Sequence, residues 1–240
     1  MGLVPRIATI LFFISIPVLL VTTNVRWAAN EARLYHYSFD KYDAEAATGI
    51  SRSELDRAAD KLVRYFNNDD ETIRIFVQED DRRVPLFNER ETSHLTDVKN
   101  LFRTVFRVQE ASLAFALVFV VTVFIWAVEA PLRILARILL QASLFTLGLL
   151  ALFAVLALVG FDELFLRFHL VAFTNDLWKL NPNTDHLIQM FPRGFWFDAT
   201  MLVAGLTAVE AVLLASLSAI YLRVRLRLRV GPLAVGQPRV

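Results

Sequence analysis

Two histidines have carboxylates close by along the chain, and this combination can perform acid–base chemistry. Glu91, His94 and Asp97 follow one another at intervals of three residues. On a helix this spacing places all three side chains on one face, so a carboxylate one turn away can orient the imidazole and fix its tautomer. An imidazole oriented in this way is a general base near neutral pH. A solvated polar helix face is the alternative interpretation.

The second histidine, His169, lies one turn from Phe165 and one turn from Phe173, in an apolar setting. Asn175 and Asp176 follow six and seven residues later, close enough along the chain to fold back toward the imidazole. The pattern allows a second catalytic histidine. It equally allows a histidine that only anchors a helix at a membrane surface.

The remaining residues narrow the chemistry. The chain has no cysteine, which excludes a thiol nucleophile, a disulfide and a thiolate zinc site. A catalytic zinc site needs three protein ligands and an open position, and no H-E-x-x-H or comparable spacing occurs, so we expect no metal. His186, beside Asp185, is expected to be structural, and His36 is given no role.

The elements that must position these residues are mostly membrane helices. Hydrophobic residues make up 56% of the 240 residues, and four apolar runs, 7–25, 111–128, 138–160 and 199–222, are long enough to cross a bilayer. We therefore predict a mainly α membrane protein with four transmembrane helices and a small mixed α/β extracytoplasmic cap. The net charge of +1 indicates no nucleic-acid partner.

The predicted organisation divides the chain into seven segments. They are a first span acting as an uncleaved signal anchor (1–25), an extracytoplasmic cap (26–108), a second span (109–130), a third span (137–160), an extracytoplasmic interfacial loop (161–198), a fourth span (199–222) and a basic cytoplasmic tail (223–240).

Arginines near the spans indicate the orientation. Arg6, Arg133, Arg137 and the arginines of 223–240 fall on one side of a four-span protein, and that side is expected to be cytoplasmic. We therefore expect a multi-pass protein of the cytoplasmic (inner) membrane with both termini in the cytoplasm. The polar segments that carry His94 and His169 then lie together on the extracytoplasmic face.

Local patterns predict the elements around the histidines. Ser51 and Glu54 have capping-box spacing before an amphipathic helix, and the alternation within 71–79 predicts a strand followed by a turn and a second short strand. From residue 92 the pattern is helical without a break into the second span. Residues 161–172 predict an amphipathic interfacial helix. Glu210, within the fourth span, is either functional or a protonated carboxyl bonded to a neighbouring helix.

Two motifs carry a resemblance to a known family. "NERETSHLTDVKNLF" at 88–102 and "FHLVAFTNDLWKLNPNTDHLIQMFPRGFW" at 168–196 resemble the bacterial four-span membrane family that includes lipoprotein intramolecular transacylase (Lit). The resemblance covers almost the whole chain. It implies transfer of an acyl chain from the glyceryl ester to the N-terminal cysteine amine of a diacylated lipoprotein, giving a lyso-form lipoprotein. It also implies that His94 and His169 are the catalytic histidines.

From this resemblance we expect a monomer that needs no cofactor and whose partners are the diacylated lipoprotein and membrane lipid. His94 would be the base and His169 the donor to the oxyanion or the leaving oxygen, although the roles can be exchanged. The supporting residues would be Glu91, Asp97, Lys99, Asn175 and Asp176. The alternatives are a non-enzymatic membrane sensor or assembly protein with a ligand-binding cap, and a metal-dependent membrane hydrolase.

Overall fold

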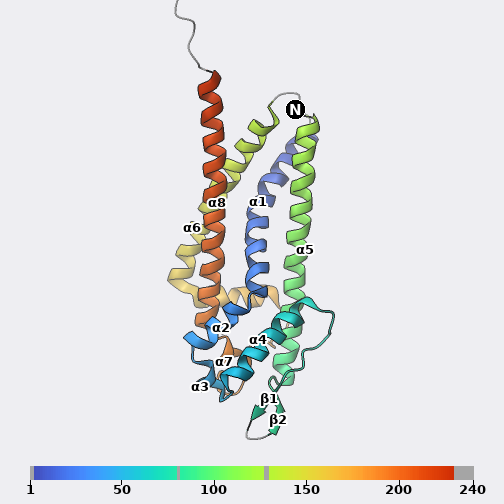
Figure 1. Ribbon diagram of the computed structural model, residues 1–240, viewed down its shortest axis with the longest axis vertical. Coiled ribbons are helices and arrows are strands. Elements are labelled where there is room, and N and C mark those ends of the chain that lie inside the picture. The colour runs from blue at the N-terminus through green and yellow to red at the C-terminus, as the bar shows by residue number, and fades with distance from the viewer. Residues whose placement is uncertain (1–2, 80–81, 127–129, 230–240) are drawn as a thin grey trace, which may run out of the picture.

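Four long helices form the body of the molecule (Figure 1). The structure is a computed structural model and describes residues 3–79, 82–126 and 130–229. The long helices are α1 (Leu3–Asn30), α5 (Glu89–Trp126), α6 (Pro131–Ala172) and α8 (Arg193–Arg229). Each contains an apolar stretch long enough to cross a membrane, which agrees with the four predicted spans.

The outward faces of these helices are apolar. Ile125, Leu158 and Val159 are 71%, 71% and 84% exposed, and most large aliphatic side chains along the four helices also point outward. An apolar surface of this extent is unfavourable in water and suits the hydrocarbon core of a bilayer. The chain is therefore a multi-pass membrane protein.

Short elements gather at one end of the long helices (Figure 1). They are α2 (Ala32–Lys41), α3 (Ala44–Thr48), α4 (Arg52–Asn67), α7 (His186–Met190) and an antiparallel hairpin of β1 (Phe76–Glu79) and β2 (Arg82–Pro85). The hairpin is shorter than the predicted strand, which was expected from residue 71. The alternation is still visible in burial, because Ile73, Ile75 and Val77 all point into the core of these elements.

Helix α4 covers that core with the predicted apolar face. Leu55, Ala59 and Leu62 are almost completely buried along it. The predicted capping box is wrong, because the Ser51 side chain makes no cap hydrogen bond and the Glu54 carboxylate pairs with Arg57 instead. Burial of the apolar face therefore stabilises α4 more than side-chain capping of its first turn does.

Two features of the long helices set the position of the histidines. Helix α5 is continuous from Glu89 to Trp126, so the predicted unbroken helix is confirmed. Helix α6 changes direction at Gly160, whose φ of −157° and ψ of 59° are not helical. After this kink residues 161–172 run across the ends of the other helices rather than along them (Figure 1).

A polar contact joins α1 to α8 within their apolar stretches. The Asn24 side-chain amide donates to Thr207 Oγ1 at 3.1 Å and to Glu210 Oε2 at 2.8 Å. Glu210 is thus bonded to a neighbouring helix, as one of its two interpretations predicted.

Candidate functional site

The two histidines meet where α5 and the kinked end of α6 come together. His94 lies in the second turn of α5, and His169 lies beyond the Gly160 kink. Their ring centroids are 6.3 Å apart, and each residue is only 7% exposed. This separation leaves room for one reacting group or one water between the two imidazoles.

A hydrogen bond fixes the tautomer of His169. Its Nδ1 lies 2.7 Å from the carbonyl oxygen of Phe165, one turn earlier in the helix. Because a carbonyl oxygen only accepts hydrogen bonds, Nδ1 must carry the proton. In the neutral ring Nε2 then holds the lone pair, so His169 can accept a proton at that atom.

The electrostatic setting keeps both rings neutral. Burial, together with the nearby His169 ring, lowers the pKa of His94 from 6.5 to about 4, although Asp97 acts in the opposite direction. Burial also lowers the pKa of His169. Both residues lie outside the apolar stretches of their helices. Within the described residues, His94 Nδ1 is buried and has no hydrogen-bond partner, which is rare for a buried polar atom.

Aromatic rings line one side of the histidine pair. The His169 ring lies 4.3 Å from the Phe165 ring and 4.9 Å from the Trp178 ring, measured between centroids. Phe173 contacts both histidines, with its ring centroid 5.1 Å from that of His94. This apolar wall suits a hydrocarbon chain and excludes water from the imidazoles.

A polar pocket of about 260 Å³ opens beside this wall, between α5 and the segment after α6. Asp97 lines it from α5 and Asn175 lines it from the segment after α6, and Asn175 Nδ2 donates to Asp97 Oδ2 at 2.9 Å. The remaining lining residues are Asn100, Leu101, Thr104, Ala172, Phe173 and Thr174. A half-buried carboxylate next to two neutral imidazoles can attract an ammonium group.

Glu91 has a different place from the one predicted. Its carboxylate accepts hydrogen bonds from the backbone N–H of Asn88 at 2.8 Å and of Leu187 at 2.7 Å. The Asn88 side chain accepts in turn from the Glu91 N–H at 3.0 Å, which makes a capping box at the start of α5. The prediction that Glu91 orients His94 is therefore wrong. Its role is to hold α7 against the start of α5.

Lys99 lies apart from the histidines as well. Its ammonium group donates to the Asp70 carbonyl at 2.6 Å and to Asn68 Oδ1 at 3.0 Å, and it covers the Tyr65 ring. Lys99 therefore fastens the loop after α4, and its predicted role as a donor in the site is wrong. Lys99 follows His94 by five residues, and this spacing places the two side chains on different faces of α5.

Asp176 is exposed and pairs with Lys179, while its backbone carbonyl accepts from Arg90 at 2.7 Å. This residue shapes the loop without reaching the imidazoles.

Sequence reasoning missed part of what holds the loop after α6. Asp185 is buried and accepts from the Asn88 side chain at 3.0 Å and from the Asn181 N–H at 2.7 Å. His186 Nδ1 contacts the Leu86 carbonyl at 2.7 Å, which fits the structural role expected for it. The N-x-x-E spacing of Asn88 and Glu91 was the available signal, because Asn is a favoured N-cap residue.

The arrangement of possible metal-binding side chains gives no support to a metal-dependent hydrolase. In the part of the chain that the structure describes, no three His, Asp or Glu side chains gather closely enough to hold a metal ion.

Comparison with known proteins points in one direction. The family model "Lipoprotein intramolecular transacylase Lit" matches residues 10–196. A structure of the membrane integral lipoprotein intramolecular transacylase Lit from Bacillus cereus superposes with a TM-score of 0.79 at 21% identity, covering 95% of this chain and 100% of that one. Two structures of the same protein with a single histidine replaced give a TM-score of 0.73, covering 93% of this chain. These likenesses show a shared fold.

A curated relative from Aquifex aeolicus (strain VF5), described as an uncharacterized protein, is 30% identical over 127 residues. The match spans 53% of this chain and about half (54%) of that relative. The family model covers more than three quarters of the chain, including His94, His169 and every residue that contacts both. The chain belongs to the lipoprotein intramolecular transacylase (Lit) family.

Proposed function

We propose that this protein moves an acyl chain from the glyceryl ester of a diacylated lipoprotein to the α-amine of its N-terminal cysteine, leaving a lyso-form lipoprotein. One observation carries the proposal: two buried imidazoles with lowered pKa values lie 6.3 Å apart, and Phe173, which contacts both, also lines a pocket that contains the Asp97 carboxylate. The wall suits the acyl chains, and the pocket suits the amine. Family membership supports the same activity.

The tautomer of His169 favours this residue as the base, which exchanges the roles expected from the sequence. An α-amine has a pKa near 8, so the attacking neutral form is a minority at neutral pH. Asp97 attracts the ammonium form and Nε2 of His169 takes its proton. The amine nitrogen then bonds to the ester carbonyl carbon, whose oxygen becomes an oxyanion.

His94 supplies a donor for that oxyanion. Its neutral ring carries one proton, and the buried Nδ1 is without a partner among the described residues, so the ring can turn its N–H toward the substrate. Collapse of the intermediate breaks the bond between the carbonyl carbon and the glycerol oxygen. The protonated His169 gives its proton to that oxygen, the attacking nitrogen releases its second proton to solvent, and the products are an amide and an alcohol.

The main requirement of the reaction is that the amine and the ester are held in the correct orientation. The amine and the ester belong to one molecule, so holding them together removes most of the entropic barrier. An amide is more stable than an ester, so the transfer runs downhill without a cofactor. We place the site at the extracytoplasmic face of the inner membrane, with both termini in the cytoplasm, and we propose that one monomer is sufficient.

A sensor or assembly protein is the less favoured function. A sensor or assembly protein does not require two histidines from distant segments to lie close together. The 6.3 Å between the two ring centroids therefore favours the enzyme.

The test compares purified His94→Ala and His169→Ala variants with the unmodified protein on a diacylated lipopeptide. We expect each variant to lose at least about a hundredfold in the rate of lyso-lipopeptide formation, since acid–base groups contribute about 10²–10⁴. His36→Gln is the matched control, because His36 lies on α2 beside Asp56, away from the pair. Unchanged rates in the His94 and His169 variants would contradict the proposal.

A further inference from the structure

A second pocket lies at the opposite end of the long helices from the histidines. It measures about 470 Å³ and is bounded by the end of α5, the first turn of α6 and the last turns of α8. In Figure 1 this end carries the N-terminus and the last turns of α8, far from the short elements. Nothing in the acyl transfer uses this pocket, so it raises a separate question.

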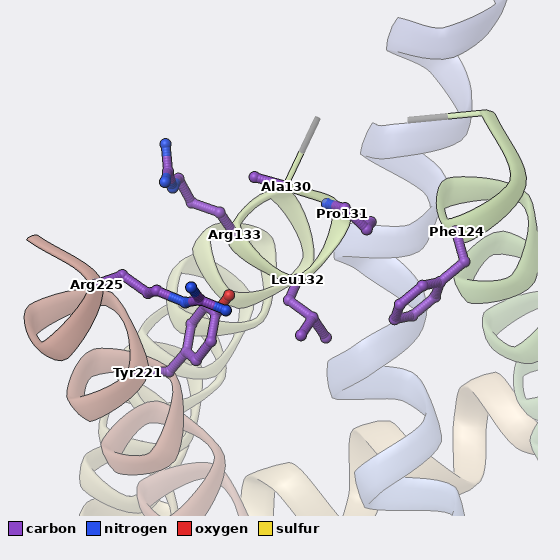
Figure 2. Close-up of a pocket in the computed structure, with 7 residues that line it drawn as sticks. All are labelled: Phe124, Ala130, Pro131, Leu132, Arg133, Tyr221 and Arg225. Carbon is purple, nitrogen blue, oxygen red and sulfur yellow. The ribbon is translucent and has the colours of Figure 1, made fainter. Parts of the chain in front are cut away.

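One side of this pocket is cationic. Figure 2 shows Tyr221 and Arg225 reaching from α8 toward the first turn of α6, and the Arg133 side chain extending outward from that turn; all three residues line the pocket. The Arg225 guanidinium lies 5.6 Å from the centre of the Tyr221 ring, which holds it beside the phenol. None of the described lining residues is acidic; Glu129 precedes Ala130 in the sequence and lies outside the described residues.

The other side is apolar and opens toward lipid. Phe124 on α5 and Leu132 on α6 face each other across the gap between the helices, and they are 49% and 46% exposed (Figure 2). Pro131 continues this wall at the first turn of α6, where the helix dipole also has its positive end. A ligand for the whole pocket therefore needs an anionic group joined to a hydrocarbon part.

We propose that this pocket binds the phosphate group of an acidic phospholipid. Arg133 and Arg225 provide planar guanidinium donors, which match phosphate oxygens well, and the Tyr221 hydroxyl provides one more donor. The acyl chains lie along Phe124 and Leu132. Basic pockets between the ends of transmembrane helices are a known means of retaining anionic lipids, and the arginine distribution places this end at the cytoplasmic leaflet.

The test measures binding of fluorescent phosphatidylglycerol and phosphatidylcholine, with identical chains, to the full-length protein in detergent micelles. The Arg133→Gln/Arg225→Gln variant removes both pocket guanidiniums. The matched control, Arg137→Gln/Arg223→Gln, removes the same charge from exposed positions of the same two helices outside the pocket. Leu132→Trp fills the pocket without changing the charge. This variant tests lipid binding in the pocket if the double glutamine variant does not fold.

We expect phosphatidylglycerol to bind at least about tenfold more weakly to the pocket variant and to Leu132→Trp, and within about twofold of normal to the control. If the pocket variant and the control lose affinity for phosphatidylglycerol equally, the lipid is attracted by the overall surface charge and not by this pocket. Equal binding of phosphatidylcholine would leave only an apolar groove. Displacement of the lipid by an equal concentration of inorganic phosphate would assign the site to the free ion. Each of these three results overturns the proposal.

Discussion

At the scale of single residues, the site depends on two imidazoles that stay neutral. The pKa of His94 is lowered from 6.5 to about 4, mainly by burial. The unfolded chain therefore binds more protons at this position between pH 6.5 and about 4, so the free energy of unfolding falls as the pH falls through that window. Above pH 6.5 the contribution is constant.

Replacement of His94 by Gln removes this dependence. Between pH 6.5 and 4.5 we expect the melting temperature of the unmodified protein to fall by roughly 5 °C more than that of His94→Gln. Thermal unfolding in detergent, followed by circular dichroism, measures both. Parallel curves for the two proteins would show that burial of His94 does not disfavour its protonation.

Glu91 is expected to matter for stability before it matters for chemistry. Glu91→Ala leaves the N–H of the buried Leu187 without a partner and removes the bond to the Asn88 N–H, which costs about 1–3 kcal/mol. We predict a large drop in melting temperature. Glu89→Ala, at an exposed position of the same turn, is the control and should leave the melting temperature nearly unchanged. A Glu91→Ala protein that is stable but inactive would contradict this prediction and indicate that Glu91 takes part in the reaction.

Residue types and spacing predicted part of this site. His94, His169, Asp97 and Asn175 are brought together as expected. Lys99 was misassigned because helical spacing defines a face but does not say which neighbour that face meets. The tautomer of His169 depends on a backbone carbonyl, and no side-chain pattern reveals such a contact.

At the scale of elements, the start of α8 must pack against the C-terminal end of α2. Gly194, at the start of α8, lies so close to Tyr42 that an added Cβ would stand 2.6 Å from its hydroxyl oxygen. Tyr42 cannot move freely, because this hydroxyl donates to Asp198 at 2.7 Å.

Gly194→Ala should therefore destabilise the protein by about 1–3 kcal/mol through overpacking. Gly205→Ala lies on the same helix with nothing near its Cβ position, and we expect it to be neutral or slightly stabilising. Melting temperatures of the two variants give the comparison. Equal melting temperatures would contradict the prediction, because they would mean that Tyr42 moves away from the added methyl group without loss of stability.

The contact between α1 and α8 has its own test. Asn24→Leu removes the donor to Thr207 and Glu210 and should lower the free energy of unfolding by about 1 kcal/mol, since each of the two lost interhelical hydrogen bonds contributes modestly in a membrane. Thr22→Val, whose hydroxyl bonds only within its own helix, is the matched control. A similar loss in both would point to local helix effects rather than to the interhelical contact.

Hydropathy and periodicity predicted the elements well where burial is one-sided. The four apolar helices, the α4 face and the continuous α5 all follow from such patterns. The strand expected from residue 71 was overextended, because alternating burial also occurs in chain that packs against a core without pairing to another strand. The Ser51 cap failed because a favourable spacing offers a bond that packing need not use.

At the scale of the whole molecule, two ends of one helical bundle are specialised differently. One end joins the histidines, an aromatic wall and a polar pocket, and the other carries the arginine-lined pocket of α6 and α8 (Figure 1). The kink at Gly160 makes the first end possible, because it turns the end of α6 across the bundle toward α5. No single segment of the sequence contains this arrangement, so only its components could be predicted.

Mass spectrometry of lipoprotein N-termini, from bacteria with and without this protein, tests the central claim most directly. With the protein present, we predict lipoproteins whose mass is unchanged from the diacyl form but whose fragments place one acyl chain on the cysteine nitrogen and one on glycerol. Cells that carry His94→Ala or His169→Ala should keep both chains on glycerol. Identical fragments in all of these cells would contradict an acyl shift by this protein.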